Sequence, residues 1–275
     1  MLRLISLACA LALAACDGNY AVTGTGPETP VRIVSLDYCA DQYVLKFVSP
    51  DRILAVSPDA GREFSYMRDK AQAVNSVRPR VENVLELQPD LIVRSYGGGA
   101  GAQAMYERAG IPVLNIGYAN NLNEIASVTR TVAHRLGVSD RGEAVIADFE
   151  NRLGAIAANE TAPQTLYMTP SGVTSGPGTL IHDMLLAAGL ANYQTRPGWR
   201  SLPLEELVYA PPELIAAAFF DTQPHKTGAW SSMRHPVATT QLQQRPVVSL
   251  NGAWTSCGAW FLIDAIEALA QGDRS

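Results

Sequence analysis

The stretch that decides the fold is VENVLELQPDLIV, residues 81–93, which returns in altered form as LEELVYAPPELIA, residues 204–216. Each copy starts with a few residues that suit a short helix and then reaches a proline beside an acidic residue. Because proline lacks a backbone donor and clashes inside a helix, it ends the helical pattern. The apolar run that follows is typical of a buried strand. A unit repeated in this way predicts two similar halves.

Strands and helices alternate on both sides of each copy. Short β-branched runs predict strands at 31–36, 52–56, 91–93, 113–116, 164–168, 214–220 and 246–250. Apolar positions at helical spacing predict helices at 40–48, 81–87, 103–109, 123–136, 139–158, 179–188 and 258–270. This alternation is typical of parallel sheets built from βαβ units.

One helical pattern, beginning at Ser139, is longer than the others. At 20 residues a helix is about 30 Å long, which is enough to cross one domain and reach a second. We therefore expect an α/β fold of two Rossmann-like βαβ lobes joined by a single long helix, with a ligand cleft between the lobes. The expected parts are an N-terminal lobe at 31–138, the connecting helix at 139–160 and a C-terminal lobe at 161–275.

The first residues predict a targeting segment that is not part of the fold. Arg3 is followed by an apolar run over residues 4–15, which as a helix would be about 18 Å long and too short to cross a bilayer. Such a run is typical of a secretory signal peptide, here residues 1–15. Its end, Leu-Ala-Ala-Cys16, resembles the lipobox of bacterial lipoproteins, which implies lipidation of Cys16. The alternative is an ordinary signal peptide with a free Cys16. Residues 16–30, rich in Gly, Thr and Pro, suit a flexible tether.

Composition excludes several classes of protein. The formal net charge is −5, and charged residues make up 17% of the 275 residues, against about 25% in an average globular protein. The sequence contains no block of Lys or Arg, which would be expected in a nucleic-acid binder. The four histidines, His134, His182, His225 and His235, lack the spacing of a metal site, and no Ser-His-Asp pattern indicates a hydrolase.

The leader, the repeated unit and the long helix together resemble periplasmic binding proteins for cobalamin and ferric siderophores. These are the substrate-binding components of ABC importers for metal chelates, and the resemblance covers about residues 31–270. It implies a monomeric, non-enzymatic protein, anchored in the periplasm through Cys16, that delivers a chelate to a permease. No cofactor is implied, since the ligand is itself the metal chelate. Two alternatives remain, a chelatase-like enzyme and a ligand-sensing lipoprotein without a permease.

The resemblance also implies two docking points. In this family each lobe presents a surface Glu on the helix before the Pro-acidic stop, and these pair with arginines of the permease. The matching positions are Glu82 and Glu205, with Glu206 as an adjacent competitor. The alternative is that both are ordinary acids of a first helical turn, where the helix dipole favours negative charge.

A ligand cleft is expected at the carboxyl ends of the strands, where loops leave the two sheets. These loops carry aromatic residues that suit an apolar wall, namely Tyr38, Tyr96, Tyr118, Trp199, Trp230 and Trp254. Arg62, Arg94 and Arg200 are candidates for anionic groups. The expected ligand-binding set is Tyr38, Cys39, Tyr96, Tyr118, Trp199, Arg200, Trp254 and Cys257. Without a basic cluster, the loops favour a corrinoid or another weakly charged chelate over a trianionic catecholate. They do not separate corrinoid, siderophore and haem.

Cys39 and Cys257 each lie just past an expected strand, one in each lobe. Three interpretations are open: a disulfide across the cleft, two buried inert thiols, or thiolates in contact with the ligand. An oxidising compartment favours the disulfide. That interpretation requires the two Cα atoms to lie within about 7 Å.

Overall fold

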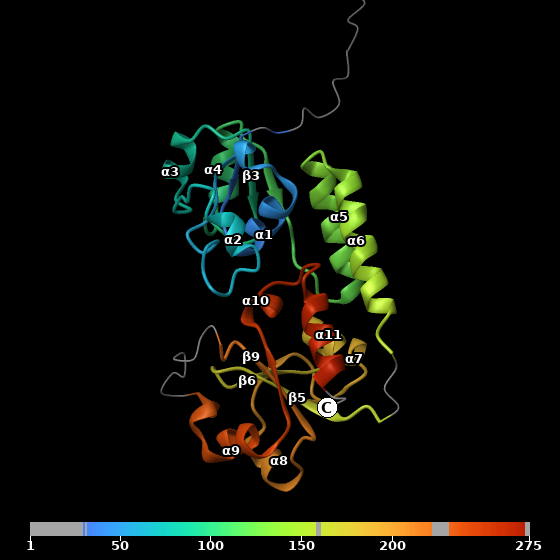
Figure 1. The fold of residues 1–275 in the computed structure, drawn as a ribbon. Helices are drawn as coiled ribbons and strands as arrows, with labels where there is room; N and C mark the ends of the chain where they lie inside the picture. Colours follow the sequence, from blue (N-terminus) through green and yellow to red (C-terminus); the bar gives the residue numbers. More distant parts are fainter. Residues whose placement is uncertain (1–29, 31, 158–160, 222–230, 273–275) are drawn as a thin grey trace, which may run out of the picture.

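The computed structural model describes residues 30, 32–157, 161–221 and 231–272, which form two lobes, one above the other in Figure 1. The N-lobe is the part built around the sheet of β1 (Ile33–Ser35), β2 (Ile53–Ala55), β3 (Leu91–Arg94) and β4 (Val113–Asn115), in the order β2-β1-β3-β4. The C-lobe is built around β5 (Gln164–Met168), β7 (Ala191–Asn192), β9 (Leu214–Ala218) and β10 (Val247–Leu250), in the order β10-β9-β5-β7. All neighbouring strands in both sheets are parallel.

Alternating side chains of the N-lobe strands bury both faces of its sheet. Ile33 and Val93 pack with α1 (Tyr38–Phe47) on one face. Val34 and Ile92 pack on the other face with α3 (Val81–Glu86) and α4 (Ala102–Arg108). A short helix, α2 (Arg68–Ala71), and a 3-10 turn, η1 (Pro50–Arg52), lie in the connections.

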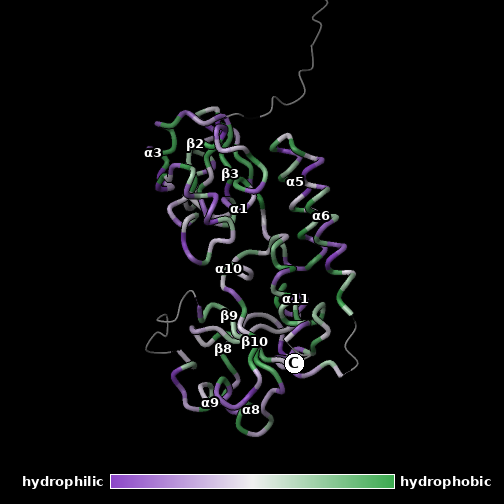
Figure 2. Tube along the Cα trace, viewed as in Figure 1, coloured by the Kyte–Doolittle hydropathy of each residue, from purple (hydrophilic) through white to green (hydrophobic). Residues whose placement is uncertain are grey.

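The C-lobe has the same three layers. Its sheet packs on one face against α7 (Leu180–Ala187) and α11 (Leu262–Gly272), and on the other against α8 (Leu204–Tyr209) and α9 (Pro236–Gln244). Figure 2 shows hydrophobic residues along the central strands of this lobe. An antiparallel ribbon of β6 (Val173–Ser175) and β8 (Trp199–Ser201), the helix α10 (Gly252–Thr255) and a 3-10 turn, η2 (Ser232–Arg234), complete it.

The repeated unit folds as expected in both lobes. Residues 81–93 form α3 and β3, and residues 204–216 form α8 and most of β9. Leu87 is the C-cap of α3, and Gln88, just before Pro89, has a positive φ of 50°. The expected strand at 164–168 coincides with β5. The elements that were not expected from the sequence include β7, α9 and the ribbon of β6 and β8.

Two antiparallel helices, not one, contact both lobes. They are α5 (Leu122–Arg135) and α6 (Ser139–Gly154), which lie side by side in Figure 1. In α5, Val132 belongs to the N-lobe core and Ile125 to the C-lobe core. In α6, Val145 packs on the first core and Phe149 lies in the second. Residues 158–160 of the expected connecting helix lie outside the described residues.

The chain returns to the N-lobe near its end. Trp260 and Phe261, between α10 and α11, are buried in the N-lobe core. The Trp260 ring meets Tyr43 of α1 at a centroid distance of 5.1 Å, and Phe261 stacks on Tyr66 at 4.5 Å. This segment therefore joins the lobes on the side of α1.

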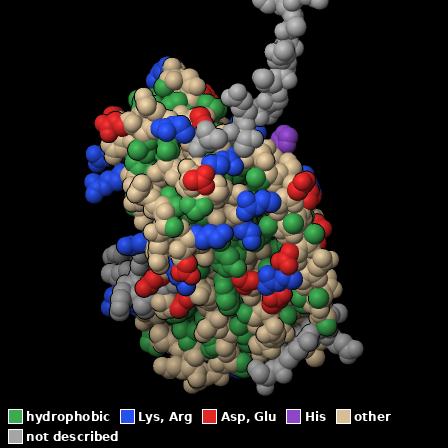
Figure 3. All heavy atoms as spheres, turned by 45° about the horizontal axis from the view of Figure 1, so that its top comes forward, with side chains coloured by type: hydrophobic (Ala, Val, Ile, Leu, Met, Phe, Trp, Pro, Cys, Tyr) green, Lys and Arg blue, Asp and Glu red, His purple; other side chains and the backbone are tan. Residues whose placement is uncertain are grey.

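No helix among the described residues is long and apolar enough to cross a membrane. The expected signal peptide, Cys16 and nearly all of the tether lie outside the described residues. On the face drawn in Figure 3, basic and acidic side chains are interspersed, with no large block of one sign.

Candidate ligand-binding cleft

A cavity of about 520 Å³ lies between the lobes. The N-lobe contributes the start of α1 and the loop after β3, and the C-lobe contributes the start of α7, the start of β8 and the loop after α10. Among the described residues that line the cavity, none carries a charged side chain. They are Tyr38, Cys39, Tyr96, Tyr118, Ala119, Asn120, Gly178, Thr179, Leu180, Ile181, Gly198, Trp199, Thr255, Ser256, Cys257, Gly258 and Leu262.

Four of the expected aromatic residues meet in this cavity. Tyr38 and Tyr96 form an edge-to-face pair with ring centroids 6.1 Å apart. Tyr118 and Trp199 expose 62% and 58% of their surface, although both are large apolar side chains. Because both exposed rings line the cavity, they are available for a ligand. Trp199 packs edge-to-face against the buried Tyr167, with ring centroids 6.3 Å apart.

Two of the phenols remain neutral over the physiological range. Burial raises the pKa of Tyr38 above its usual value of 10, and the Asp37 and Asp59 carboxylates raise it further. Burial likewise raises the pKa of Tyr96, with added contributions from Tyr38 and Asp37. The Tyr38 hydroxyl donates to the Ser256 carbonyl oxygen at 2.9 Å. This bond links the start of α1 to the C-lobe.

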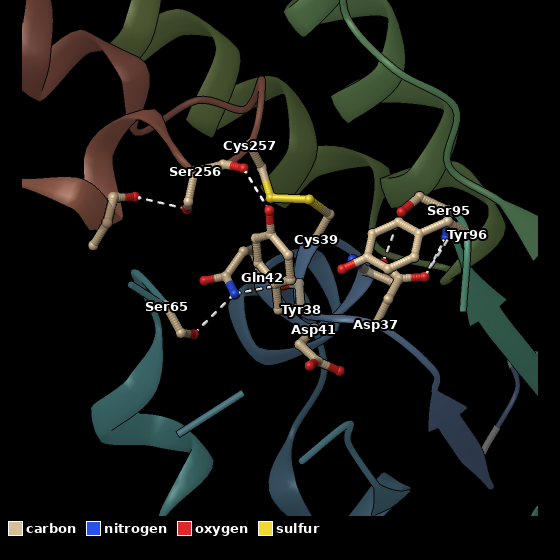
Figure 4. Close-up of a disulfide and its surroundings, with 12 residues drawn as sticks. Asp37, Tyr38, Cys39, Asp41, Gln42, Ser65, Ser95, Tyr96, Ser256 and Cys257 are labelled. Carbon is tan, nitrogen blue, oxygen red and sulfur yellow. Dashed lines mark hydrogen bonds between the residues drawn. A yellow bond between two sulfur atoms is a disulfide. The ribbon is translucent and has the colours of Figure 1, made fainter. Parts of the chain in front are cut away.

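Cys39 and Cys257 form a disulfide, with their Cα atoms 5.8 Å apart. The disulfide interpretation is therefore confirmed, and the two interpretations with free thiols are wrong. Both cysteines line the cavity, so the bridge is part of its surface. Figure 4 shows the bridge beside the Tyr38–Ser256 hydrogen bond, where two segments far apart in sequence meet.

Two residues of the expected ligand-binding set do not line the cavity. Arg200 follows Trp199 on β8, so its side chain points to the opposite face of the strand, and its Nε donates to the Pro197 carbonyl at 3.1 Å. Trp254 is partly buried against the C-lobe core. The expectation that these two contact a ligand is therefore not supported by their position.

The other candidates from the loops have different positions. Arg94 is only 9% exposed, and its Nη2 donates to the carbonyl oxygens of Tyr96 and Gly99 at 3.2 and 3.4 Å. Arg62 is exposed and does not line the cavity. Trp230 lies outside the described residues. Phe64, which was not among the expected residues, packs edge-to-face against Tyr38 with ring centroids 5.2 Å apart. The signal that could have identified Phe64 is an aromatic residue within the polar loop that follows β2.

The two expected docking glutamates lie on α3 and α8, which are at opposite ends of the molecule in Figure 1. Both are exposed residues of a first helical turn. The neighbouring Glu206 pairs with Arg196 at 3.5 Å. A hollow of about 640 Å³ beside α8 is lined by Glu205 and Tyr209, among others. Within the described residues, no group of three or more His, Cys, Asp or Glu side chains has an arrangement that suits a metal ion.

Comparison with known proteins gives the family and the fold. Among curated proteins, none matches this sequence at a significant level. The haem-binding protein RhuT from Roseiflexus sp. RS-1 is 20% identical, with a TM-score of 0.71 over 88% of this chain and 97% of that chain. The haem-binding protein HutB of Vibrio cholerae is 16% identical, with a TM-score of 0.72 over 88% and 98%. The vitamin B12-binding protein BtuF of Vibrio cholerae is 18% identical, with a TM-score of 0.62 over 90% and 97%. These structures share the two-lobed fold.

A family model described as "Periplasmic binding protein" matches residues 33–250, most of the chain. The chain therefore belongs to this family of periplasmic binding proteins.

Proposed function

We propose that this periplasmic binding protein is the substrate-binding lipoprotein of an ABC importer and captures a metal chelate between its lobes. The observation that carries the proposal is the cavity between the lobes, which has aromatic rings on both sides. Flat apolar faces of this kind suit a large chelate whose periphery is itself apolar or planar. By their titles, RhuT and HutB bind haem, and BtuF binds vitamin B12.

The electrostatics of the cavity favour a weakly charged chelate. No described lining residue is charged, and the carboxylates of Asp37 and Asp59 make the surroundings of Tyr38 negative. A trianionic complex placed here gains no ion pair from the described lining and is repelled by these carboxylates. A corrinoid or another weakly charged chelate fits better.

Delivery to the permease rests on Glu82 and Glu205. They occupy equivalent places in the repeated unit, one at each end of the molecule, so a partner that contacts both is held in one orientation. Charge-assisted contacts to arginine are directional enough for this role. Glu206 is engaged with Arg196, which favours Glu205 as the docking residue of α8.

The docking role is tested by reversing both charges, Glu82→Arg with Glu205→Arg. We expect uptake of the chelate to be abolished and its binding to be unchanged. The matched control is Glu86→Arg, which reverses an exposed charge on α3 away from the equivalent position. Unaffected uptake in the double variant would refute docking through these residues.

Anchoring depends on Cys16, at the end of the expected signal peptide. Changing Cys16→Ser should leave the protein unlipidated and move it from the membrane fraction. Mass spectrometry of the mature N-terminus checks this, and an unmodified Cys16 in the wild type would contradict the lipoprotein assignment.

Ligand binding is tested by tryptophan-quenching titration with cyanocobalamin, haemin and a panel of ferric siderophores. We expect saturable quenching by one of them, and a smaller signal in Trp199→Phe because Trp199 lies at the cavity. Saturable binding to none of them would overturn the proposal. Turnover of a chelate would favour a chelatase-like enzyme, and binding without uptake would favour a sensor.

A further inference from the structure

One buried carboxylate, which does not line the cavity, accepts five hydrogen bonds. Asp37, between β1 and α1, is 3% exposed. Its Oδ1 accepts from the Ala40 backbone N–H at 3.0 Å, which caps α1, and from Ser95 Oγ at 2.7 Å. Its Oδ2 accepts from three successive backbone N–H groups, those of Ser95, Tyr96 and Gly97, at 2.7, 3.0 and 2.8 Å. Figure 4 shows Asp37 directed at this loop.

Asp37 therefore has two tasks. Its Oδ1 holds the first turn of α1 and also accepts from the loop residue Ser95, and its Oδ2 lies in a concave nest of backbone N–H groups, an arrangement that suits an anion. Hydrogen bonds to an ionised acceptor are stronger than neutral ones. Asp37 thus ties the loop after β3 to the start of α1, across a sequence distance of about 60 residues.

The same loop is held at its carbonyl groups and by close packing. Arg94 donates to the carbonyl oxygens of Tyr96 and Gly99, so the loop is bound on both sides of its peptide groups. At Gly97 the loop lies so close to Leu36, just after the first strand, that a methyl group on this residue would overlap the Leu36 carbonyl oxygen. Asp37 therefore positions the loop together with Arg94 and the packing at Gly97, and it does so through three successive loop amides.

The side chain that this loop presents to the cavity is Tyr96. Tyr38 and Cys39, which also line the cavity, follow Asp37 directly on α1. The centroids of the Tyr96 and Tyr38 rings are 6.1 Å apart, and the rings meet edge-to-face. This arrangement is kept only if the loop after β3 stays at the same position relative to α1. Asp37 is the group that bonds to both.

We propose that Asp37 is the positioning residue of the N-lobe wall of the cleft: it holds the Tyr96 loop against α1 and thereby sets the aromatic surface that a chelate meets. The proposal rests on the proposed function only in its use of chelate affinity as one readout. Asp37 itself does not touch the ligand.

The variants separate the two tasks of Asp37. Asp37→Ser retains a good helix cap, but its side chain is too short to reach the three loop amides. Asp37→Asn is the conservative variant for the loop, because its amide oxygen can take the place of Oδ2 and accept from those amides. Its NH₂, in the place of Oδ1, can donate to Ser95 Oγ but faces the Ala40 N–H, so this variant gives up the cap of α1. The matched control is Asp41→Ser, another buried carboxylate of α1, which binds the backbone N–H and Oγ of Ser57 instead.

The first measurement is amide hydrogen exchange of the free protein. We expect the amides of residues 95–97 to exchange at least about tenfold faster in Asp37→Ser, the change that corresponds to a loss of 1.4 kcal/mol. Asp37→Asn should restore much of the protection, and Asp41→Ser should leave these amides unchanged. Because no ligand is present, this measurement decides whether Asp37 holds the loop even if the proposed function fails. Unchanged exchange in Asp37→Ser would overturn the inference.

The second measurement is a double-mutant cycle with Tyr96→Ala, using cyanocobalamin as the probe, or haemin if the titration selects haem. We expect Asp37→Ser to weaken binding by about tenfold, but by less than about twofold when Tyr96→Ala is already present. Asp41→Ser and Tyr96→Ala should be additive. A general loss of stability does not produce coupling to Tyr96, so additive effects of Asp37→Ser and Tyr96→Ala would overturn the positioning role. A wild type that binds neither probe would contradict the proposed function, and the exchange measurement would still decide the role of Asp37.

Discussion

Removing the disulfide, by Cys39→Ser with Cys257→Ser, should cost a large part of the stability of this protein. The bridge joins residues 218 positions apart and so restricts nearly the whole unfolded chain. In the chain-entropy description, closing a loop of this length is worth about 5 kcal/mol at 25 °C, and measured bridges typically give about 2–4 kcal/mol. Against a typical total of about 5–15 kcal/mol, we expect a loss of about 2–5 kcal/mol.

The folded state should survive this change with its lobes still in contact. The Tyr38–Ser256 hydrogen bond remains beside the bridge, and Trp260 stays buried in the N-lobe core. The effect therefore falls mainly on the unfolded ensemble, which becomes less compact. A less compact unfolded state exposes more surface, so the slope of the unfolding free energy with denaturant should increase as the midpoint falls.

The assay is equilibrium urea unfolding of the wild type and the double serine variant, each with and without a phosphine reductant. Reductant should lower the wild-type midpoint towards that of the variant and leave the variant unchanged. Thiol titration of the denatured, unreduced wild type should find neither Cys39 nor Cys257 free. Two titratable thiols, or equal midpoints for the wild type and the variant, would refute the reasoning.

Three further predictions concern the cleft, a buried acid and an ion pair between helices. Trp199→Ala should weaken chelate binding by about five- to tenfold, the effect of one lost aromatic contact, while Arg200→Ala should not, as isothermal titration calorimetry would reveal. Burial raises the pKa of Asp41 from 3.8 to about 7 in the folded protein, so the proton stabilises the fold fully below about pH 4 and this stabilisation is lost as the pH rises through about 7. Asp41→Asn should flatten the dependence of the urea midpoint on pH in that window, and an unchanged slope would contradict the shifted pKa. Arg152 of α6 forms 2.6 Å contacts with Asp264 and Glu267 of α11, so Arg152→Met should destabilise by about 1 kcal/mol at low salt and less at high salt; a salt-independent loss would indicate packing instead.

Much of the architecture could be predicted because it depends on local patterns. The repeated unit at 81–93 and 204–216 contains its own helix, stop and strand, and each lobe folds it in the same way. The aromatic wall could be located because loops at the carboxyl ends of parallel strands meet at one edge of each sheet. Tyr38 and Tyr96 accordingly share the cavity.

The remainder depends on contacts between distant residues. The sequence around Cys39 and Cys257 favours a bridge but leaves inert thiols and ligand contacts open, and the arrangement of the two lobes selects the bridge. Arg200 was expected at the ligand as a candidate for anionic groups, whereas residues 199–201 form a short strand on which the side chains of Trp199 and Arg200 point opposite ways. Asp37 bonds to backbone amides about 60 residues away, and backbone amides leave no mark in a sequence.

Trp260 and Phe261 have a consequence for the order in which the chain folds. The core of the N-lobe is built from the first part of the described chain, yet these two residues, near the end of the sequence, complete it. They lie beyond residue 250, where the match to the family model ends. During synthesis the N-lobe emerges first, but its core closes only when the last part of the chain is available. Such dependence on remote contacts slows folding. A chain cut short before residue 260 lacks α11 in the C-lobe and these two rings in the N-lobe, so both lobes need the end of the chain for their native packing.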